Sequence, residues 1–398
     1  MALPVASGAP HGMSVPWQVV VVGAGVAGAY VAARLAHAGV SVLLVDRGRF
    51  PRNKVCGACL SGRALAVLKR CPVLEVANIP EKSGMKHLGR VRIGTGAGTV
   101  ELPLGAGGAL SRDRLDAGLV SAARHSGATV WEETEALSAT VFGSYRRVRM
   151  QRLGETVEVD ASLVIAAEGL GGRILAREES LPDLVSVNSR VGAGCVLPGN
   201  STDHYESDTI HMACGKHGYL GLVRQEDDSL DLAMAADQVG LAQSGGPARL
   251  AAKILEGCQW PVPVGMMSAP WRGTPRLTHQ RNVGASRLVV VGDAAAYVEP
   301  FTGEGMGWAL EAAETLVPLV LDACSSGSLD QVHNRWQTAY RKLSTPRKKF
   351  VCSALAWGLR RPACVDATVC LLRLVPALAW PVTWLLDRQS LPRPGTMS

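Results

Sequence analysis

The sequence predicts an α/β fold in which a parallel sheet with its helices is joined to an antiparallel sheet and a helical C-terminal tail. Short apolar runs at residues 18–22, 40–45 and 287–291 are typical of buried parallel strands, and helical patterns separate them. Residues 88–104 alternate between apolar and polar side chains, and residues 187–236 contain short strand-like runs without helices. These two regions predict the antiparallel sheet.

Composition excludes several classes of protein. The chain has 398 residues, of which 47% are hydrophobic and 19% charged, enough apolar material for two domains or one large domain. This content excludes wholesale disorder, and 44 glycines without a three-residue period exclude a collagen-like chain. The net charge is +7, but the basic residues are spread widely and no recognition motif accompanies them. We therefore expect no nucleic acid as a partner.

The ten cysteines are dispersed, and the first 17 residues lack the basic and apolar regions of a secretory signal. We therefore expect a cytoplasmic protein with reduced thiols. Cys56 and Cys59 have the spacing of a zinc or redox motif, but zinc requires two further ligands and no matching pair follows. We expect no metal site. A dithiol relay lacks its usual strand–helix context, so a plain buried thiol is the default for Cys59.

A glycine-rich motif, GAGVAG, directly follows the first apolar strand and opens a helix. Gly23 permits the tight turn, Gly25 lets the backbone approach a pyrophosphate, and Gly28 lets the helix pack closely on the strand. The start of the helix, at Val26 and Ala27, supplies amide donors and the positive end of the helix dipole. The motif in this context predicts a dinucleotide site.

The second apolar strand ends at Asp46, at the distance from the last glycine where a carboxylate can accept a hydrogen bond from a ribose 2′-hydroxyl. An acid here favours FAD or NAD over NADP, because a 2′-phosphate would be repelled. The succession of strand, turn, helix, strand and acid predicts a Rossmann-type domain.

A third apolar strand leads into the stretch VGDAAAYVEPFTGEGMGWAL, which resembles the GD signature of FAD-dependent monooxygenases and geranylgeranyl reductases. Asp293 at the strand end can bond a ribityl hydroxyl of a flavin. The loop and helix start at Pro300, Gly303, Gly305 and Met306 would place amide groups and a helix dipole where reduced flavin carries negative charge. The motif therefore selects FAD.

Two further segments resemble the same proteins. SRDRLDAGL is similar to an R-x-x-F-D-x-x-L segment, which implies that Arg112 lies by the FAD phosphates or the ring edge; a solvated helix face is the alternative. AAEGLGG stands where the family has A-D-G-x-x-S, with Glu168 in place of Asp and Gly172 in place of Ser. That segment contributes to flavin and nicotinamide contacts in hydroxylases, so the two changes count against a hydroxylase.

The stretch FPRNKVCG resembles the F-P-R-x-K-x-C-G segment of the geranylgeranyl reductase branch. The resemblance implies that Cys56 lies beside the isoalloxazine ring, where it could protonate a carbanion-like centre or shape the site. Arg52, Lys54 and Gly57 of this segment, and Arg47 directly after Asp46, are further candidates for binding the cofactor. The cations could offset flavin or phosphate charge, or be surface charges.

The chain is thus identified as a member of the geranylgeranyl reductase and aromatic-ring monooxygenase (p-hydroxybenzoate hydroxylase-like) superfamily of FAD-dependent oxidoreductases. The resemblance is strong in the flavin segments and vague in the middle. We expect a loose extension at 1–16; an FAD-binding domain in three parts at 17–86, 109–186 and 281–327; a substrate domain of a hairpin at 87–108 and an antiparallel sheet at 187–280; and a helical basic and apolar tail at 328–398.

Three functions remain open. The first is a geranylgeranyl reductase-like enzyme that reduces a carbon–carbon double bond of a lipophilic substrate with hydride from flavin N5. The second is a monooxygenase that hydroxylates an aromatic or polyketide substrate. The third is a flavin electron carrier that docks on a membrane partner. Halogenation is set aside because the W-x-W-x-I-P segment of flavin halogenases is missing.

The electron donor and the proton donor are less well defined. No second GxGxxG follows an apolar strand, so NADH or NADPH would bind only transiently. His211, His217 and Tyr219 lie in the predicted substrate sheet and could donate a proton, but such residues are more often structural, and none is assigned a catalytic role.

A helix expected over 304–319 precedes a tail with unusual charge. Residues 335–361 carry eight basic side chains and no acid, and 365–386 are rich in Leu, Val, Ala and Trp. Charges and prolines interrupt the apolar part, which argues against a simple transmembrane helix. Peripheral contact with a membrane is one hypothesis, and a helical tail packed on the FAD-binding domain is the other.

Overall fold

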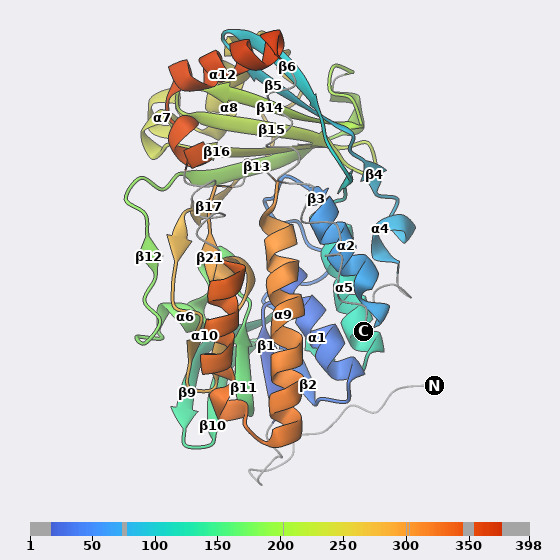
Figure 1. The fold of residues 1–398 in the computed structure, drawn as a ribbon, viewed down its shortest axis with the longest axis vertical. Coiled ribbons are helices and arrows are strands. Elements are labelled where there is room, and N and C mark those ends of the chain that lie inside the picture. Colours follow the sequence, from blue (N-terminus) through green and yellow to red (C-terminus); the bar gives the residue numbers. More distant parts are fainter. Residues whose placement is uncertain are drawn as a thin grey trace.

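The computed structural model describes residues 17–73, 78–201, 203–299, 301, 303–344 and 354–375. Figure 1 shows two halves stacked along the long axis, a parallel sheet with its helices below and a largely antiparallel sheet above. The predicted extension at 1–16, Pro300, and the tail residues 345–353 and 376–398 lie outside the described residues.

The parallel sheet has the strand order β8-β2-β1-β11-β20, with β19 antiparallel at one edge. Its valine and leucine strands are buried, apart from the first two residues of β1, because they are covered on both faces. Since β1 lies between β2 and β11, a crevice forms at the carboxyl ends of these strands. The strands are β1 (Trp17–Val22), β2 (Val42–Val45), β8 (Thr129–Trp131), β11 (Glu155–Ala166), β19 (Gly284–Ala285) and β20 (Leu288–Val290).

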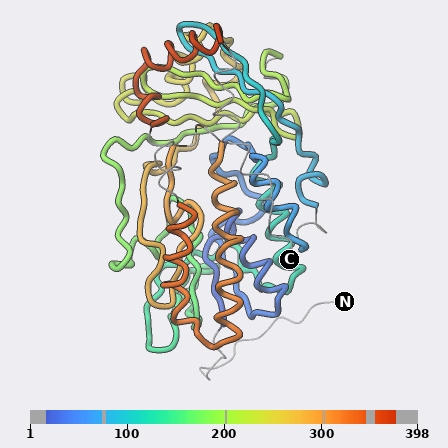
Figure 2. Tube along the Cα trace, viewed as in Figure 1, coloured from blue at the N-terminus to red at the C-terminus, as the bar shows by residue number. Residues whose placement is uncertain are grey.

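Helices from distant parts of the chain cover one face of this sheet. α1 (Val26–His37) packs against both α5 (Arg112–His125) and α9 (Gly305–Ser326), and α2 (Gly62–Arg70) packs against α9. Figure 2 shows the blue α1 and the orange α9 side by side. The carboxyl ends of the strands and the start of α1 and α9 therefore meet at the same edge of the sheet.

A long antiparallel ribbon extends the other side of the sheet. It is formed by β9 (Thr134–Phe142), β10 (Tyr145–Arg152) and the first part of β11. Neither β9 nor β10 is predicted from the sequence, because Arg146 takes a buried position that the alternation would give to an apolar residue. Its guanidinium pairs with Glu178 at 2.6 Å. α6 (Arg173–Ala176) packs on β9, and α10 (Val332–Leu343) packs on β20.

The upper sheet has the order β17-β13-β16-β15-β14-β5-β6. Neighbouring strands are antiparallel except for β14 and β5, which are parallel because the β5–β6 hairpin comes from an early segment of the chain. The strands are β5 (Arg90–Thr95), β6 (Gly98–Pro103), β13 (Val191–Leu197), β14 (Thr209–Gly215), β15 (Gly218–Arg224), β16 (Leu230–Ala236) and β17 (Arg272–Arg276).

The two faces of the upper sheet have different neighbours. On the outer face, α8 (Pro247–Gly257) and Trp260 bury the apolar side chains of β13 to β16, and α7 (Gln238–Ser244) packs on α8. On the inner face, Met212 and Tyr219 pack with Phe301 and Leu359. α12 (Pro362–Leu374) lies over β5 and β6 (Figure 1).

Short elements join the halves. They are a small sheet of β3 (Cys59–Ser61), β7 (Gly107–Ala109) and β4 (Lys86–His87), a second of β12 (Leu184–Val185), β18 (His279–Gln280) and β21 (Ala296–Tyr297), and the helix α4 (Ile79–Lys82).

The predicted fold class is confirmed, including the hairpin at 88–104 and the antiparallel run at 187–236, and the described parts of the tail contain the helices α10 and α12. One helix differs from its prediction. α9 continues past 319 to Ser326 although Pro318 lies inside it. An internal proline costs about 3 kcal/mol, and packing of α9 on both α1 and α2 offsets this.

Candidate active site

The glycine turn between β1 and α1 can be built only from glycine at two positions. Gly23 has φ 99°, and a Cβ there would lie 2.3 Å from the carbonyl oxygen of Ala167. A Cβ at Gly28 would lie 1.9 Å from the carbonyl oxygen of Gly23. Side chains are thus excluded where α1 touches β11 and its own turn, as the motif predicts.

Gly25 faces two cations instead of backbone. A Cβ at Gly25 would lie 3.6 Å from Arg112 Nη2 and 3.9 Å from Arg52 Nη2, ordinary contact distances. The space in front of Gly25 is therefore bounded by the start of α1, at Val26 and Ala27, and by two guanidinium groups. Amide donors, a helix dipole and two cations are the groups that favour binding of a pyrophosphate in such a space.

Asp46 supports the turn from the end of β2. Its carboxylate accepts hydrogen bonds from the amides of Ala24 at 2.7 Å and Gly48 at 2.8 Å, and Arg52 Nη2 lies 3.3 Å away. The Asp46 side chain is buried. It therefore holds the glycine turn and Arg52 in place, and its hydrogen bond to a ribose stays a prediction.

Arg112 is buried rather than exposed on a helix face. It is the first residue of α5, and its Nε and Nη2 donate to Asp116 at 2.9 and 2.7 Å. The Asp116 side chain is completely buried, and Arg52 Nη2 lies 3.7 Å from it. Arg52 and Arg112 both contact Asp116, and Arg52 also contacts Asp46, so buried carboxylates hold both guanidinium groups beside Gly25.

Lys54 and Asp293 lie at the next part of the crevice, 3.9 Å apart between Nζ and Oδ2. Burial and the neighbouring Arg112 lower the pKa of Lys54. Asp293 lies on a 3-10 turn, Gly292–Ala294, and its carbonyl contacts His279 Nε2 at 2.9 Å. The His279 Nδ1 contacts Asp183 at 2.7 Å. His279 is therefore a positioning residue that the sequence alone does not reveal.

Cys56 is half-buried and packs against the core of the parallel sheet. Cys59 donates from its thiol to the carbonyl of Gly57 at 2.9 Å, and burial raises the pKa of the Cys59 thiol. A redox pair requires a thiol with a lowered pKa, so the geometry gives no support to a relay through Cys59.

The segment before α9 lies against these cysteines. A Cβ at Gly303 would lie 3.5 Å from the Cβ of Cys59, and one at Gly305 would lie 3.4 Å from the ring of Tyr297. Met306 is buried in the first turn of α9. Gly303, Gly305 and Met306 are thus brought to the same edge as Cys59.

Arg47 lies apart from the other cations. Its side chain is exposed, and it lines a surface depression of about 540 Å³ with Glu133 and Glu135. In the described part of the chain, Arg52, Lys54 and Arg112 form the cationic group, and Arg47 forms no recorded contact with them.

The two departures in the AAEGLGG segment depend on each other. The Glu168 carboxylate accepts from the amides of Arg173, Ile174 and Leu175 at the start of α6. A Cβ at Gly172 would lie 2.4 Å from that carboxylate. The longer acid therefore needs the glycine, and the pair keeps a capped helix start at this position.

The inner face of the upper sheet carries two buried titratable side chains, Tyr219 and Asp231. Among the described residues, neither the hydroxyl of Tyr219 nor Oδ2 of Asp231 has a hydrogen-bond partner. Burial raises the pKa of both groups well above their usual ranges. The Tyr219 ring contacts Phe301 edge-on, with 5.1 Å between centroids. His211 faces the outer side, among Tyr205 and Trp260.

Comparison with known proteins agrees with this geometry. Residues 16–182 match a family model described as an FAD binding domain. The matched segment contains the glycine turn, Asp46, Arg52 and Arg112, which meet in front of Gly25. The chain is an FAD-dependent oxidoreductase. FAD is therefore confirmed as the cofactor, and the glycine turn with Arg52 and Arg112 fits its pyrophosphate.

This oxidoreductase is similar to two curated reductases. A menaquinone reductase of Mycolicibacterium smegmatis is 28% identical over 344 residues, which cover 80% of this chain and 79% of the relative. A digeranylgeranylglycerophospholipid reductase of Methanopyrus kandleri is 28% identical over 356 residues, which cover 82% of this chain and 87% of the relative.

A solved structure has a similar fold. The flavin-dependent brominase Bmp2 matches with a TM-score of 0.76 at 14% identity, covering 93% of this chain and 94% of the brominase. At this identity, the likeness shows the fold alone.

Proposed function

We propose that the protein reduces a carbon–carbon double bond of a lipophilic isoprenoid or quinone substrate. The carrying observation is the apolar inner face of the upper sheet, where Met212, Tyr219 and Leu359 pack opposite the nucleotide edge of the parallel sheet. When bound, FAD supplies a hydride from N5. The apolar face would hold the hydrocarbon of the substrate there and exclude water.

The reaction adds a hydride to one carbon and a proton to its neighbour. Cys56 is the proposed proton donor, because FPRNKVCG resembles the segment that places a cysteine beside the ring. Tyr219 stays protonated at neutral pH, since burial raises the pKa of its hydroxyl, and this free donor could bond a polar group of the substrate. Arg52, Lys54 and Arg112 would hold the phosphates.

The names of the relatives support this class of substrate, since menaquinone and digeranylgeranylglycerophospholipid both carry isoprenoid chains. We extend the proposal to a cytoplasmic protein that meets its lipophilic substrate at a membrane surface. NADH or NADPH would bind transiently as the electron donor. No helix in the described residues is long and apolar enough to cross a membrane.

Hydroxylation is the second candidate function, and one structural observation supports it. Glu168 and Gly172 compensate each other, so the segment keeps its capped form despite both departures. The sequence changes at this segment therefore weigh less against hydroxylation than they do without the structure.

Product mass separates the two candidates. The FAD-loaded protein is supplied with NADPH or NADH and a lipid or polyketide extract, with and without oxygen. We expect products heavier by two hydrogens in the absence of oxygen. Products heavier by one oxygen atom, formed only when oxygen is present, would refute the reductase and establish the hydroxylase.

A further inference from the structure

Helix α12 is apolar on both faces. Val369 and Leu372 pack on the β5–β6 hairpin, as expected for a surface helix. The opposite face should then be polar, but Leu371 is 50% exposed and Leu374 is 80% exposed. Val375, directly after the helix, is 44% exposed. A soluble surface helix does not normally carry such a face without a partner.

The charges around this face are cationic. Arg373 lies on α12 and is exposed, with one guanidinium nitrogen, Nη1, donating to the carbonyl of Ala97 at 3.1 Å, and Arg361 precedes the helix. The Arg361 guanidinium stacks on Trp357, 3.7 Å from the ring centroid, and Trp357 is 57% exposed. Tryptophan beside arginine is the combination found where proteins meet the interface of a bilayer.

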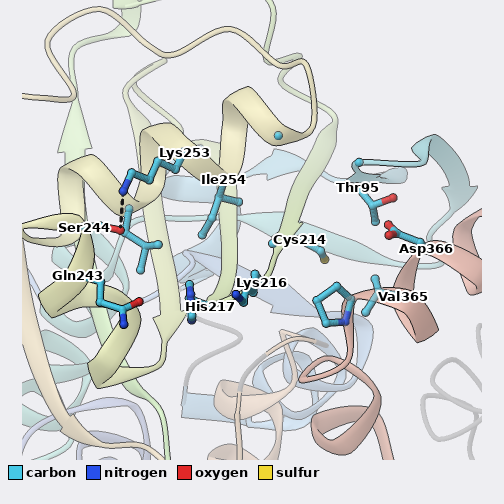
Figure 3. A pocket seen from close by; sticks show the side chains of 15 residues that line it. Thr95, Cys214, Lys216, His217, Gln243, Ser244, Lys253, Ile254, Val365 and Asp366 are labelled. Carbon is cyan, nitrogen blue, oxygen red and sulfur yellow. Dashed lines mark hydrogen bonds between the residues drawn. The ribbon is translucent and has the colours of Figure 1, made fainter.

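The single acid of α12 points elsewhere. Asp366 and Val365 line a cavity of about 410 Å³ between α12 and α8, opposite Lys253 and Ile254 (Figure 3). No acid therefore opposes the cations on the exposed face of this helix.

We propose that residues 354–375 form a docking surface for an anionic lipid bilayer, with Leu371, Leu374 and Val375 entering the interface and Arg361 and Arg373 contacting lipid phosphates. Its purpose rests on the proposed function, because a lipophilic substrate must leave a membrane to reach the flavin. The surface would shorten that path.

An ionic cluster joins the docking surface to the inner face of the upper sheet. Arg190, which is completely buried, donates to the carbonyl of Leu359 at 3.2 Å and to Glu299 at 3.2 Å. Arg360 donates to Glu299 and to Asp237. Leu359 packs with Met212 and Tyr219 on the inner face of the upper sheet. A bilayer bound by α12 would therefore lie next to that face.

A bilayer is favoured over two other partners for this face. A second copy of the chain would bring the same cations together, and Arg361 and Arg373 would repel their copies. Residues 376–398 follow α12 in the chain, but with one acid, Asp387, and two arginines they bring no net negative charge to complement Arg361 and Arg373. Anionic lipid complements both the apolar side chains and the charge.

Vesicle binding tests the inference on the full-length FAD-loaded protein. We expect it to sediment with vesicles of phosphatidylcholine and phosphatidylglycerol, and to bind less well to phosphatidylcholine alone. The double variant Leu371→Ser/Leu374→Ser should bind about tenfold more weakly or worse, because it removes two leucine side chains from the interface. Arg361→Ser/Arg373→Ser should lose the preference for the anionic vesicles.

A matched control removes equally exposed apolar side chains elsewhere. Val187 is 89% exposed and Val264 is 75% exposed, and neither lies in the docking surface. Val187→Ser/Val264→Ser should bind vesicles like the unmodified protein. The proposal would be overturned if the leucine variant and the valine variant lost vesicle binding equally, or if the unmodified protein did not bind vesicles. Two further results would also overturn it. One is a dimer in the absence of lipid that dissociates in the leucine variant, and the other is vesicle binding that appears only when the chain is truncated after residue 375.

A second readout separates this inference from the proposed function. Reduction of a short-chain, water-soluble quinone should be unchanged in Leu371→Ser/Leu374→Ser, whereas reduction of a long-chain quinone in vesicles should fall with binding. If no quinone or isoprenoid is reduced by any form of the protein while vesicle binding persists, the proposed function fails and the docking surface stands.

Discussion

The inner face of the upper sheet differs from the nucleotide edge of the parallel sheet: beside one buried pair, Arg190 with Glu299, it holds groups without a hydrogen-bond partner among the described residues. At the nucleotide edge, each charge has a partner: Arg112 and Arg52 share Asp116, and Lys54 faces Asp293. On the inner face, Tyr219 and Asp231 are buried with unpaired polar atoms among the described residues. The nucleotide edge suits a cofactor with fixed charges, and the inner face suits the mainly apolar substrate that we propose.

The difference has a physical cause. A pyrophosphate needs cations held at fixed positions, and a buried cation is stable only with a hydrogen-bonded partner. A hydrocarbon needs an apolar wall, and the few polar groups within it are free for the polar end of the substrate. Unpartnered buried groups weaken the fold, and such groups are often found at functional sites.

The largest effect is expected from Gly25→Val. The new side chain fits beside Arg112 and Arg52 in the folded protein but occupies the space of the pyrophosphate. Flavin absorbance per chain should fall by more than about tenfold, a loss of over 1.4 kcal/mol in binding. Gly257→Val is the control, because a Cβ there meets nothing within 4 Å. A fully yellow Gly25→Val protein would remove the pyrophosphate assignment.

Arg112→Met tests whether the ionic group is structural as well as cofactor-binding. It leaves Asp116 buried with only Arg52 nearby, so the free energy of unfolding should fall by about 3 kcal/mol. Urea denaturation measures this. Arg335→Met breaks the exposed pair with Asp322 and should cost less than about 1 kcal/mol. Similar losses in both variants would contradict the distinction drawn between the buried and exposed pairs.

Cys56→Ala should keep its flavin and lower turnover by about 100-fold, the range of a lost proton donor. Cys59→Ala, in the neighbouring thiol that bonds Gly57, should retain most activity. Product mass and flavin absorbance are measured on the same samples. Unchanged turnover of Cys56→Ala would make Cys56 a packing residue.

Tyr219→Phe should make the fold more stable and at the same time weaken substrate binding. Removing a buried hydroxyl without a partner should raise the free energy of unfolding by about 1 kcal/mol, while KM for a quinone should rise. The ring contact with Phe301 is kept, so the inner face of the upper sheet should keep its shape. A loss of stability in this variant would show that the hydroxyl has a partner.

Asp231→Asn should change the pH dependence of stability and little else. Burial raises the pKa of Asp231 in the folded protein, so the free energy of unfolding should fall as the pH rises from about 4, the ordinary aspartate pKa. The Asn variant should lose less stability between acid and neutral pH. Asp330→Asn, at an exposed position, serves as the control. Parallel pH curves for Asp231→Asn and the unmodified protein would refute the buried carboxyl.

The cofactor half of the site could be predicted because its signals are local. Gly23, Gly28 and Asp46 act through one turn and the adjoining strand ends, so their spacing in the chain carries their geometry. The sequence also fixes the resemblance that places Cys56 near the flavin. It does not predict the β9–β10 ribbon, since a buried charged pair, Arg146 with Glu178, conceals the alternation of the strands.

By itself, the sequence determined an FAD-binding α/β oxidoreductase, with its glycine turn and its acid at the end of β2. Only the tertiary structure decided which distant groups meet: His279 with Asp293, Glu168 against Gly172, and the buried Tyr219 against Phe301. The physical reason is that burial and pairing depend on elements far apart in the chain. No local spacing encodes whether a tyrosine hydroxyl has a partner or whether a helix face is covered.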